Sequence, residues 1–159
     1  LMFLSHLLAD ECSVSMKLFG ELPDGEAVHL YTLKNANGMT ADISNYGGII
    51  TRLLVPDRLG RVEDVVLGYD NLESYLDVSP YFGCVVGVYG NRIRDGKFEL
   101  DGNQYHVTTN SEAGGVPVLL HGGDIGLDKV LWSARPIVNM NSGLLVLNFI
   151  HHLIVRNIR

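Results

Sequence analysis

The segment KFELDGNQYHV (residues 97–107) decides the fold class of this chain. Apolar Phe98 and Leu100 alternate with charged residues, which is the period of a strand that has one apolar face. The Asp-Gly pair that follows, Asp101 and Gly102, supplies the positive φ angles that a type I′ turn requires. The sequence therefore predicts an antiparallel hairpin here.

Similar alternation recurs on both sides of this hairpin. AVHLYTLKN and MTADISNYG, joined by the turn signal NANG, predict a second hairpin over residues 27–47. Further strands are expected at residues 48–57, 61–69, 129–138 and 143–150, and residues 71–76 predict one helical turn with Asn71 as its cap. With 18 glycines and no long amphipathic helix, the chain is expected to be all-β, a sandwich or barrel of short strands.

The composition limits the class of protein. A length of 159 residues suits one domain with a sizeable core, and 47% hydrophobic against 19% charged residues excludes a disordered chain. A net charge of −6 without long blocks of like charge argues against a nucleic-acid partner. No segment reaches the roughly 18 apolar residues of a membrane span, so no membrane partner is expected.

The two cysteines, Cys12 and Cys84, lie far apart and form no CxxC motif. We expect reduced thiols and a cytoplasmic protein. The apolar start of the chain is too short for a membrane helix. As a remnant of a signal peptide it would make secretion the alternative, but it lacks the basic region of such a peptide. Residues 1–16 and 139–159 are expected to be atypical ends of one domain over residues 17–138.

His121 lies in the unusual stretch LLHGGDIGLDKVLW (residues 119–132). Glycines permit a close approach of the backbone, and a histidine there can donate or accept a hydrogen bond. From spacing alone, a loop histidine without a ligand is favoured. Asp124 and Asp128 fit turn positions, and Lys129 could pair with either of them.

A metal or nucleotide site finds little support in these residues. His121, His106 and an Asp would suit a cupin-like metal barrel, but no His-x-His pattern is present and no metal is expected. His151 and His152 would point to opposite faces of a strand. GCVVGVYG (residues 83–90) lacks both the P-loop and the GxGxxG spacing, so its glycines are expected to serve close strand packing.

Two motifs carry a resemblance to a known family. Asn91-Arg92-Ile93 precedes the 97–107 hairpin, and Leu120-His121-Gly122-Gly123 is followed by an Asp-Lys-x-x-Trp run at residues 128–132. In this order and separation they resemble the aldose 1-epimerases, also called galactose mutarotases. The resemblance covers about residues 17 to 138 and implies a galactose mutarotase-like β-sandwich, or supersandwich.

The resemblance implies that Asn91, Arg92 and His121 line a pocket for a hexose such as galactose or glucose. A neutral sugar offers only hydroxyls and ring oxygens, so hydrogen bonds must hold it. We expect a half-buried Arg92 to supply several fixed donors. Asn91 can both donate and accept, and His121 can bond the ring oxygen or a nearby hydroxyl.

The implied reaction interconverts the α and β anomers of the hexose without a cofactor or metal. A base takes the proton of the anomeric hydroxyl while an acid protonates the ring oxygen, and the ring opens and closes again on its other face. In the family the acid is a His and the base a Glu, and both lie in the second half of the protein together with a pocket Asp.

The chain also departs from the family pattern. Val88 stands where an Arg is usual, Leu127 replaces a Phe, and the approach to His121 is longer and more apolar. Family members are about twice as long, within the range of a large single β domain. Little after Pro136 matches the family, so no residue is assigned a catalytic role, and the chain is expected to be an inactive N-terminal part. A non-catalytic carbohydrate-binding module and a cupin-like barrel are the alternatives.

Overall fold

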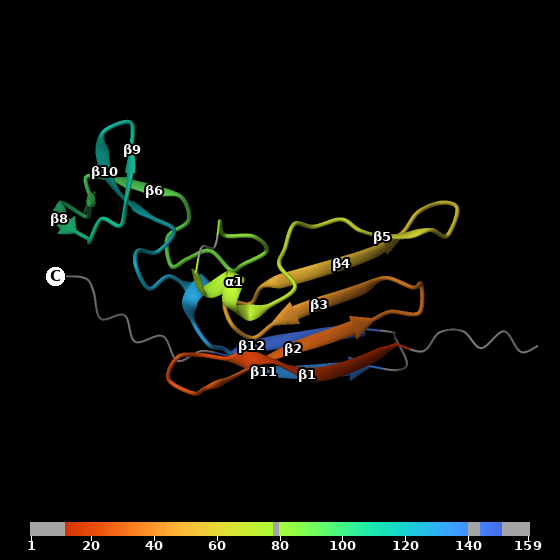
Figure 1. Ribbon diagram of the computed structural model, residues 1–159. Coiled ribbons are helices and arrows are strands. Elements are labelled where there is room, and N and C mark those ends of the chain that lie inside the picture. Colours follow the sequence, from red (N-terminus) through yellow and green to blue (C-terminus); the bar gives the residue numbers. More distant parts are fainter. Residues whose placement is uncertain (1–11, 78–79, 140–143, 151–159) are drawn as a thin grey trace, which may run out of the picture.

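The computed structural model describes residues 12–77, 80–139 and 144–150, and these residues form mainly β-strands, which confirms the all-β class (Figure 1). The large sheet has the strand order β1 (Ser13–Glu21), β2 (Ala27–Lys34), β3 (Thr40–Ser44), β4 (Ile50–Pro56) and β5 (Val62–Asp64). All neighbouring strands in it are antiparallel. The hairpin expected over residues 27–47 is therefore confirmed as β2 and β3, while β1 was not expected from the sequence.

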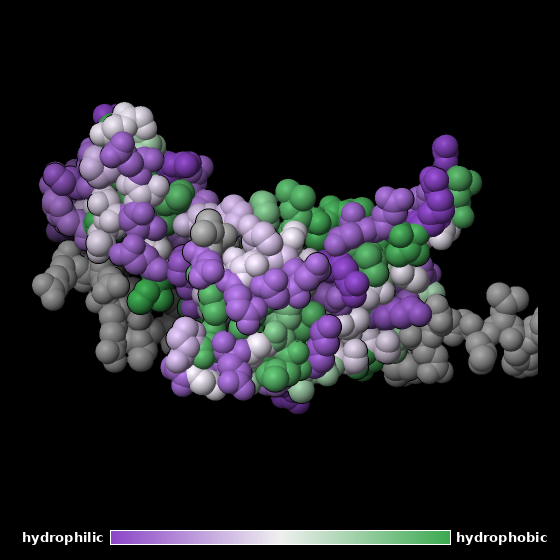
Figure 2. Space-filling model, viewed as in Figure 1, coloured by the Kyte–Doolittle hydropathy of each residue, from purple (hydrophilic) through white to green (hydrophobic). Residues whose placement is uncertain are grey.

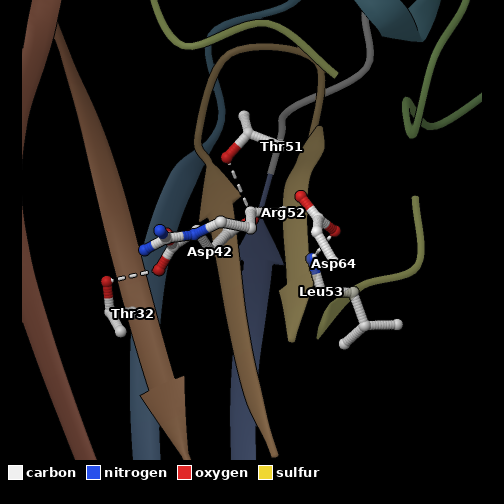
Figure 3. A network of polar contacts seen from close by, with 6 residues as sticks. All are labelled: Thr32, Asp42, Thr51, Arg52, Leu53 and Asp64. Atoms are coloured by element: carbon white, nitrogen blue, oxygen red, sulfur yellow. Dashed lines mark hydrogen bonds and ion pairs between the residues drawn. The ribbon is translucent and has the colours of Figure 1, made fainter. Parts of the chain in front are cut away.

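A second layer covers one face of the large sheet. It consists of the hairpin β11 (Ser133–Asn139) and β12 (Leu144–Ile150), which lies behind β2–β4 in Figure 3. Leu33 and Ala41 of the sheet share a cavity lining with Leu144 and Leu145 of β12. The two layers make the expected sandwich, because apolar side chains on one face of each must be removed from water.

The opposite face of the large sheet carries a polar network (Figure 3). Thr32, Asp42 and Arg52 are aligned across β2, β3 and β4 by the strand register. The Thr32 hydroxyl donates to Asp42 Oδ1 at 2.6 Å, and Arg52 Nε donates to Asp42 Oδ2 at 2.8 Å. Only 5% of the Asp42 side chain is exposed, so these partners compensate the cost of burying its charge.

The main core lies at one end of the large sheet, beneath the short helix α1 (Leu72–Asp77). Leu72 and Tyr75 of this helix are buried against Val28 of β2 and Ile49, which precedes β4. Asn71 caps the helix as expected, because its Oδ1 accepts the backbone N–H of Ser74 at 2.9 Å. No described helix is long and apolar enough to cross a membrane.

A smaller lobe extends from this end of the sheet (Figure 1). It contains β6 (Arg92–Arg94), β9 (Ser111–Ala113) and β10 (Val116–Leu120) in the order β6-β10-β9, and the separate hairpin β7 (Lys97–Leu100) and β8 (Asn103–His106). The hairpin confirms the prediction, with φ angles of 51° at Asp101 and 76° at Gly102. The surface of the smaller lobe is largely hydrophilic in Figure 2, whereas apolar patches gather over the large sheet.

Two expected strands differ from the structure, and the glycine-rich residues 83–90 show the close packing that was expected of them. Residues 83–90 form no strand, but Gly83 lies against the backbone of β4, where its carbonyl accepts the N–H of Ile50 at 3.0 Å. The strand expected over residues 61–69 ends at Asp64, because the Asp64 carboxylate accepts the N–H of Leu53 in place of a strand partner. The 3₁₀ turn η1 (Leu127–Lys129) replaces the start of the strand expected from residue 129.

Candidate functional site

Pairing between β6 and β10 brings the two sequence motifs together. Arg92 at the start of β6 is the register partner of Leu120 at the end of β10. Asn91 directly precedes β6 and His121 directly follows β10, so these residues meet at the same end of the small sheet. The structure thus brings together all three expected site residues, which lie up to 30 positions apart in the chain.

Asn91 and His121 are joined by two hydrogen bonds. The backbone N–H of Asn91 donates to Nδ1 of His121 at 3.0 Å, and the backbone N–H of His121 donates to the carbonyl of Asn91 at 3.0 Å. Because Nδ1 accepts, the neutral imidazole carries its proton on Nε2. His121 therefore presents an N–H donor at the ring atom that faces away from Asn91.

Both residues hold a strained backbone conformation. Their φ angles are 69° at Asn91 and 53° at His121, in the left-handed region that few residues other than glycine adopt. Such conformations cost about 1–3 kcal/mol each and cluster at binding and catalytic sites. The strain here is accommodated by the paired strands and the two shared hydrogen bonds.

Arg92 is exposed, so the expectation that it would be half-buried is wrong. The strand β6 has only three residues, and the small sheet offers no second layer over Arg92 in the described part of the chain. One guanidinium nitrogen, Nη1, donates to Oδ1 of Asn91 at 3.0 Å. The remaining donors of the guanidinium belong to an exposed side chain, so a ligand can reach them.

Asn110 is a positioning residue that no motif in the sequence indicated. Its Nδ2 donates to the carbonyl of Leu120 at 3.1 Å, and its Oδ1 accepts the N–H of Leu120 at 2.6 Å. This pair of bonds fixes the backbone directly before His121. A single Asn in a polar loop carries no local signal, so only the tertiary contact identifies it.

Tyr81 contacts His121 from another side, and Lys129 of the second motif contacts Tyr81 in turn. The Tyr81 ring meets the imidazole edge to face, with ring centroids 4.6 Å apart and planes at 63°. The Lys129 ammonium lies 5.5 Å from the Tyr81 ring centroid, and it pairs with Oδ2 of Asp128 at 2.6 Å. Lys129 therefore pairs with Asp128, one of the two partners that the sequence left open.

The Asp128–Lys129 pair is unequal in exposure. The Asp128 side chain is 2% exposed, and that of Lys129 is 41% exposed. Burial lowers the pKa of Lys129, but the hydrogen bond and charge of Asp128 outweigh this and leave the pKa raised. The ammonium is therefore charged at any ordinary pH.

A polar cavity of about 330 Å³ shares Tyr81 with the surroundings of His121. Tyr81 lines this cavity and also contacts His121, whereas Asn91, Arg92 and His121 are not part of its lining. The other lining residues are Tyr46, Tyr75, Leu76, Asp77, Asn110, Asp124, Asp128 and Lys129.

The glycines after His121 permit a close approach of two backbones. Gly122 has a φ of 95°, and a Cβ there would collide with the carbonyl of Gly87. The same carbonyl accepts the N–H of Leu127 at 3.1 Å. In the structure the close approach at Gly122 is to the segment that leads to Asn91.

No group of three metal-ligating side chains occurs within residues 12–77, 80–139 and 144–150. His106 lies in the β7–β8 hairpin, and His121 makes its contacts with Asn91 and Tyr81. Cys12 and Cys84 form no disulfide among the described residues. His151 and His152 lie outside the described residues.

Comparison with known proteins identifies the family of this chain. The family model described as aldose 1-epimerase matches residues 29–151, a range that extends past Pro136. Galactose mutarotase of Rattus norvegicus is 47% identical over 128 residues, which are 80% of this chain and 36% of the rat protein. Aldose 1-epimerase of Escherichia coli K12 is 35% identical over 75% of this chain and 32% of its own length.

A solved structure supports the same fold. Galactose 1-epimerase from Lactobacillus acidophilus NCFM superimposes with a TM-score of 0.67 at 24% identity, over 80% of this chain and 35% of that one. The matched part of the chain thus corresponds to about a third of the length of these relatives. Because the family model matches most of its length, this chain belongs to the aldose 1-epimerase family.

Proposed function

We propose that this chain forms the sugar-holding part of an aldose 1-epimerase that interconverts the α and β anomers of a hexose such as galactose or glucose. The observation that carries the proposal is the hydrogen bond from the Asn91 N–H to Nδ1 of His121. Together with the bond from Arg92 Nη1 to Asn91 Oδ1, it links an imidazole, an amide and a guanidinium in one cluster, the donor-rich arrangement that suits sugar hydroxyls.

The roles follow from hydrogen-bonding chemistry. Arg92 keeps its charge throughout the working pH range and donates to one or two hydroxyls. Nε2–H of His121 donates to the ring oxygen or to a neighbouring hydroxyl. Asn91 holds Arg92 through its side-chain oxygen and His121 through its backbone, so it braces both sugar-binding groups.

We further infer that the 159-residue chain alone binds a hexose without appreciable catalysis. Its matched motifs are those that the resemblance implies hold the sugar, and the family's acid His and base Glu have no counterparts among the residues assigned to the site. A positioned general acid or base contributes about 10²–10⁴-fold each. Without both groups, little rate above that in buffer is expected.

Polarimetry and calorimetry with galactose test this proposal together. The purified chain should bind galactose by calorimetry, and α-galactose should relax to equilibrium at the rate found in buffer. Relaxation well above the buffer rate would show that the chain is itself a catalyst. If the double variant His151→Ala, His152→Ala then returned to the buffer rate, one of these histidines would supply the acid. Absence of galactose binding would contradict the sugar-holding role.

A further inference from the structure

The bond to Asn91 does not by itself hold the His121 ring rigidly. A hydrogen bond to Nδ1 at 3.0 Å restricts the side-chain torsions of His121, but a hydrogen bond tolerates a spread of distances and angles, so the imidazole can still rock. Nε2 lies on the far side of the ring, so this rocking would change the direction in which its N–H points. A second contact against the ring would narrow that range.

Tyr81 supplies that second contact. Its ring meets the imidazole at 63° with a centroid separation of 4.6 Å, within the range of favourable edge-to-face aromatic pairs. Tyr81 itself has a φ of 64°, so its backbone is held in the left-handed region as those of Asn91 and His121 are. Three non-glycine residues with this conformation thus meet at one point of the surface.

Tyr81 is in turn held by Lys129. The ammonium lies 5.5 Å from the centre of the Tyr81 ring, a distance at which a cation is attracted to the face of an aromatic ring. The ammonium cannot easily leave this position, because it compensates Asp128 at 2.6 Å. Asp128 is 98% buried, and its other oxygen has no hydrogen-bond partner within the described residues, so Lys129 is its essential counterion.

We propose that Tyr81, clamped by the Asp128–Lys129 pair, is a positioning residue that sets the plane of His121 and so aims its Nε2–H at the sugar. The effect on sugar binding rests on the proposed function, whereas the effect on the ring itself does not. This role also gives a physical reason for the Asp-Lys pair that follows the His-Gly-Gly motif.

Paired substitutions separate ring packing from other effects. Tyr81→Phe keeps the ring and Tyr81→Leu removes it. Lys129→Arg keeps the cation and Lys129→Met removes it. Tyr105→Leu is the matched control, because Tyr105 packs on Phe98 in the β7–β8 hairpin, where its ring centroid lies 5.2 Å from that of Phe98.

The first readout is the long-range ¹H–¹⁵N spectrum of the imidazoles, with His121 assigned from His121→Gln. We expect Tyr81→Leu and Lys129→Met to move the His121 ring signals, while Tyr81→Phe, Lys129→Arg and Tyr105→Leu leave them in place. The second readout is galactose affinity, which should fall about 5- to 10-fold in the first two variants and stay near wild type in the other three.

The outcomes are distinguishable. Unchanged His121 signals in both Tyr81→Leu and Lys129→Met would overturn the positioning role. Equal damage by Tyr81→Phe and Tyr81→Leu would overturn it as well, because the hydroxyl rather than the ring would then be responsible. If the wild type binds no galactose, the proposed function fails, and the His121 signals still decide the positioning role. Should Tyr81→Leu not fold, Lys129→Met combined with Asp128→Asn makes the same test against Lys129→Arg, because the double change leaves no unpaired buried carboxylate.

Discussion

The backbone N–H of Asn91 lies 3.0 Å from Nδ1 of His121, and this one hydrogen bond joins two motifs 30 residues apart. It turns a pair of sequence signals into a single site. It also selects the tautomer of the imidazole, because a ring nitrogen that accepts cannot carry the proton. The candidate site therefore presents an N–H donor at Nε2, which suits the proposed binding of a neutral sugar.

Replacement of the donors should weaken galactose binding unequally. Arg92→Ala removes a charged donor and should cost about 1.5–3 kcal/mol, whereas His121→Ala removes a neutral one and should cost about 0.5–1.5 kcal/mol. Calorimetry measures both losses. Arg61→Ala is the control, since Arg61 is an exposed arginine in the turn before β5. Equal affinity in all four proteins would remove Arg92 and His121 from the binding surface.

Substitution of Gly83 should destabilise the fold more than substitution of a glycine with the same backbone angle in open space. Gly83 has a φ of 62° and Gly114 a φ of 59°, but only a Cβ at Gly83 would collide with the Ile50 carbonyl. Gly114→Ala should cost about 1–2 kcal/mol for the angle alone. Gly83→Ala should add about 1–3 kcal/mol for the collision.

Urea unfolding followed by circular dichroism measures this difference. Equal free energies of unfolding for Gly83→Ala and Gly114→Ala would show that the 83–90 segment does not pack on β4 as described. The comparison needs no assumption about function, so it tests the fold by itself.

The two partners of the ion pair in the large sheet, Asp42 and Arg52, should contribute unequally to the free energy of unfolding. Arg52→Met leaves the buried Asp42 carboxylate without its cation and should cost about 3 kcal/mol, the lower end for buried pairs, because Arg52 is 49% exposed. Asp42→Asn leaves a cation that water can solvate and should cost less, about 1.5–2 kcal/mol. In the double variant the second change should cost little, because the unpaired buried charge is gone.

The same urea experiment decides this prediction. Arg61→Met is the matched control, since Arg61 pairs with the exposed Asp57, and its unfolding midpoint should stay near that of the wild type. Strict additivity of Arg52→Met and Asp42→Asn would contradict the direct pairing of these two side chains.

The Cys84 thiol should react slowly with alkylating reagents. Burial is the main cause that raises the pKa of Cys84, and the negative charge of Asp128 raises it further. The thiolate is the reactive form, so between about pH 8 and pH 10 the folded chain should be alkylated at Cys84 more slowly than the urea-unfolded chain. Asp128→Asn should speed the reaction in part, because burial remains.

The raised pKa of Cys84 also makes the free energy of unfolding depend on pH. A raised pKa in the folded state means that the unfolded chain ionises first, so this contribution to stability is present below the ordinary thiol pKa and is lost as pH rises through the raised one. Mass spectrometry of the Cys84 peptide follows the alkylation. Equal rates in the folded and unfolded chains would show that Cys84 is not shielded.

Much of the fold follows from local patterns. The alternation in residues 97–107 and 27–47, together with the Asp101-Gly102 turn and the Asn71 cap, predicts elements that form largely from contacts between near neighbours in the chain. Such signals depend on backbone conformation and on one apolar face, and both are written in short segments. The strand β1 was not expected, although Val14, Met16 and Leu18 alternate with polar residues, because residues 1–16 were expected to be an atypical end.

The sequence by itself determined the residue types of the site and the all-β class. Asn91, Arg92 and His121 stood out through the resemblance of two motifs to the aldose 1-epimerases. Only the tertiary structure decided how they work, because the pairing of β6 with β10 selects the His121 tautomer, and Tyr81 with Lys129 holds the ring. These contacts join residues from separate segments, and no local pattern records which distant side chains a fold will bring within hydrogen-bond distance.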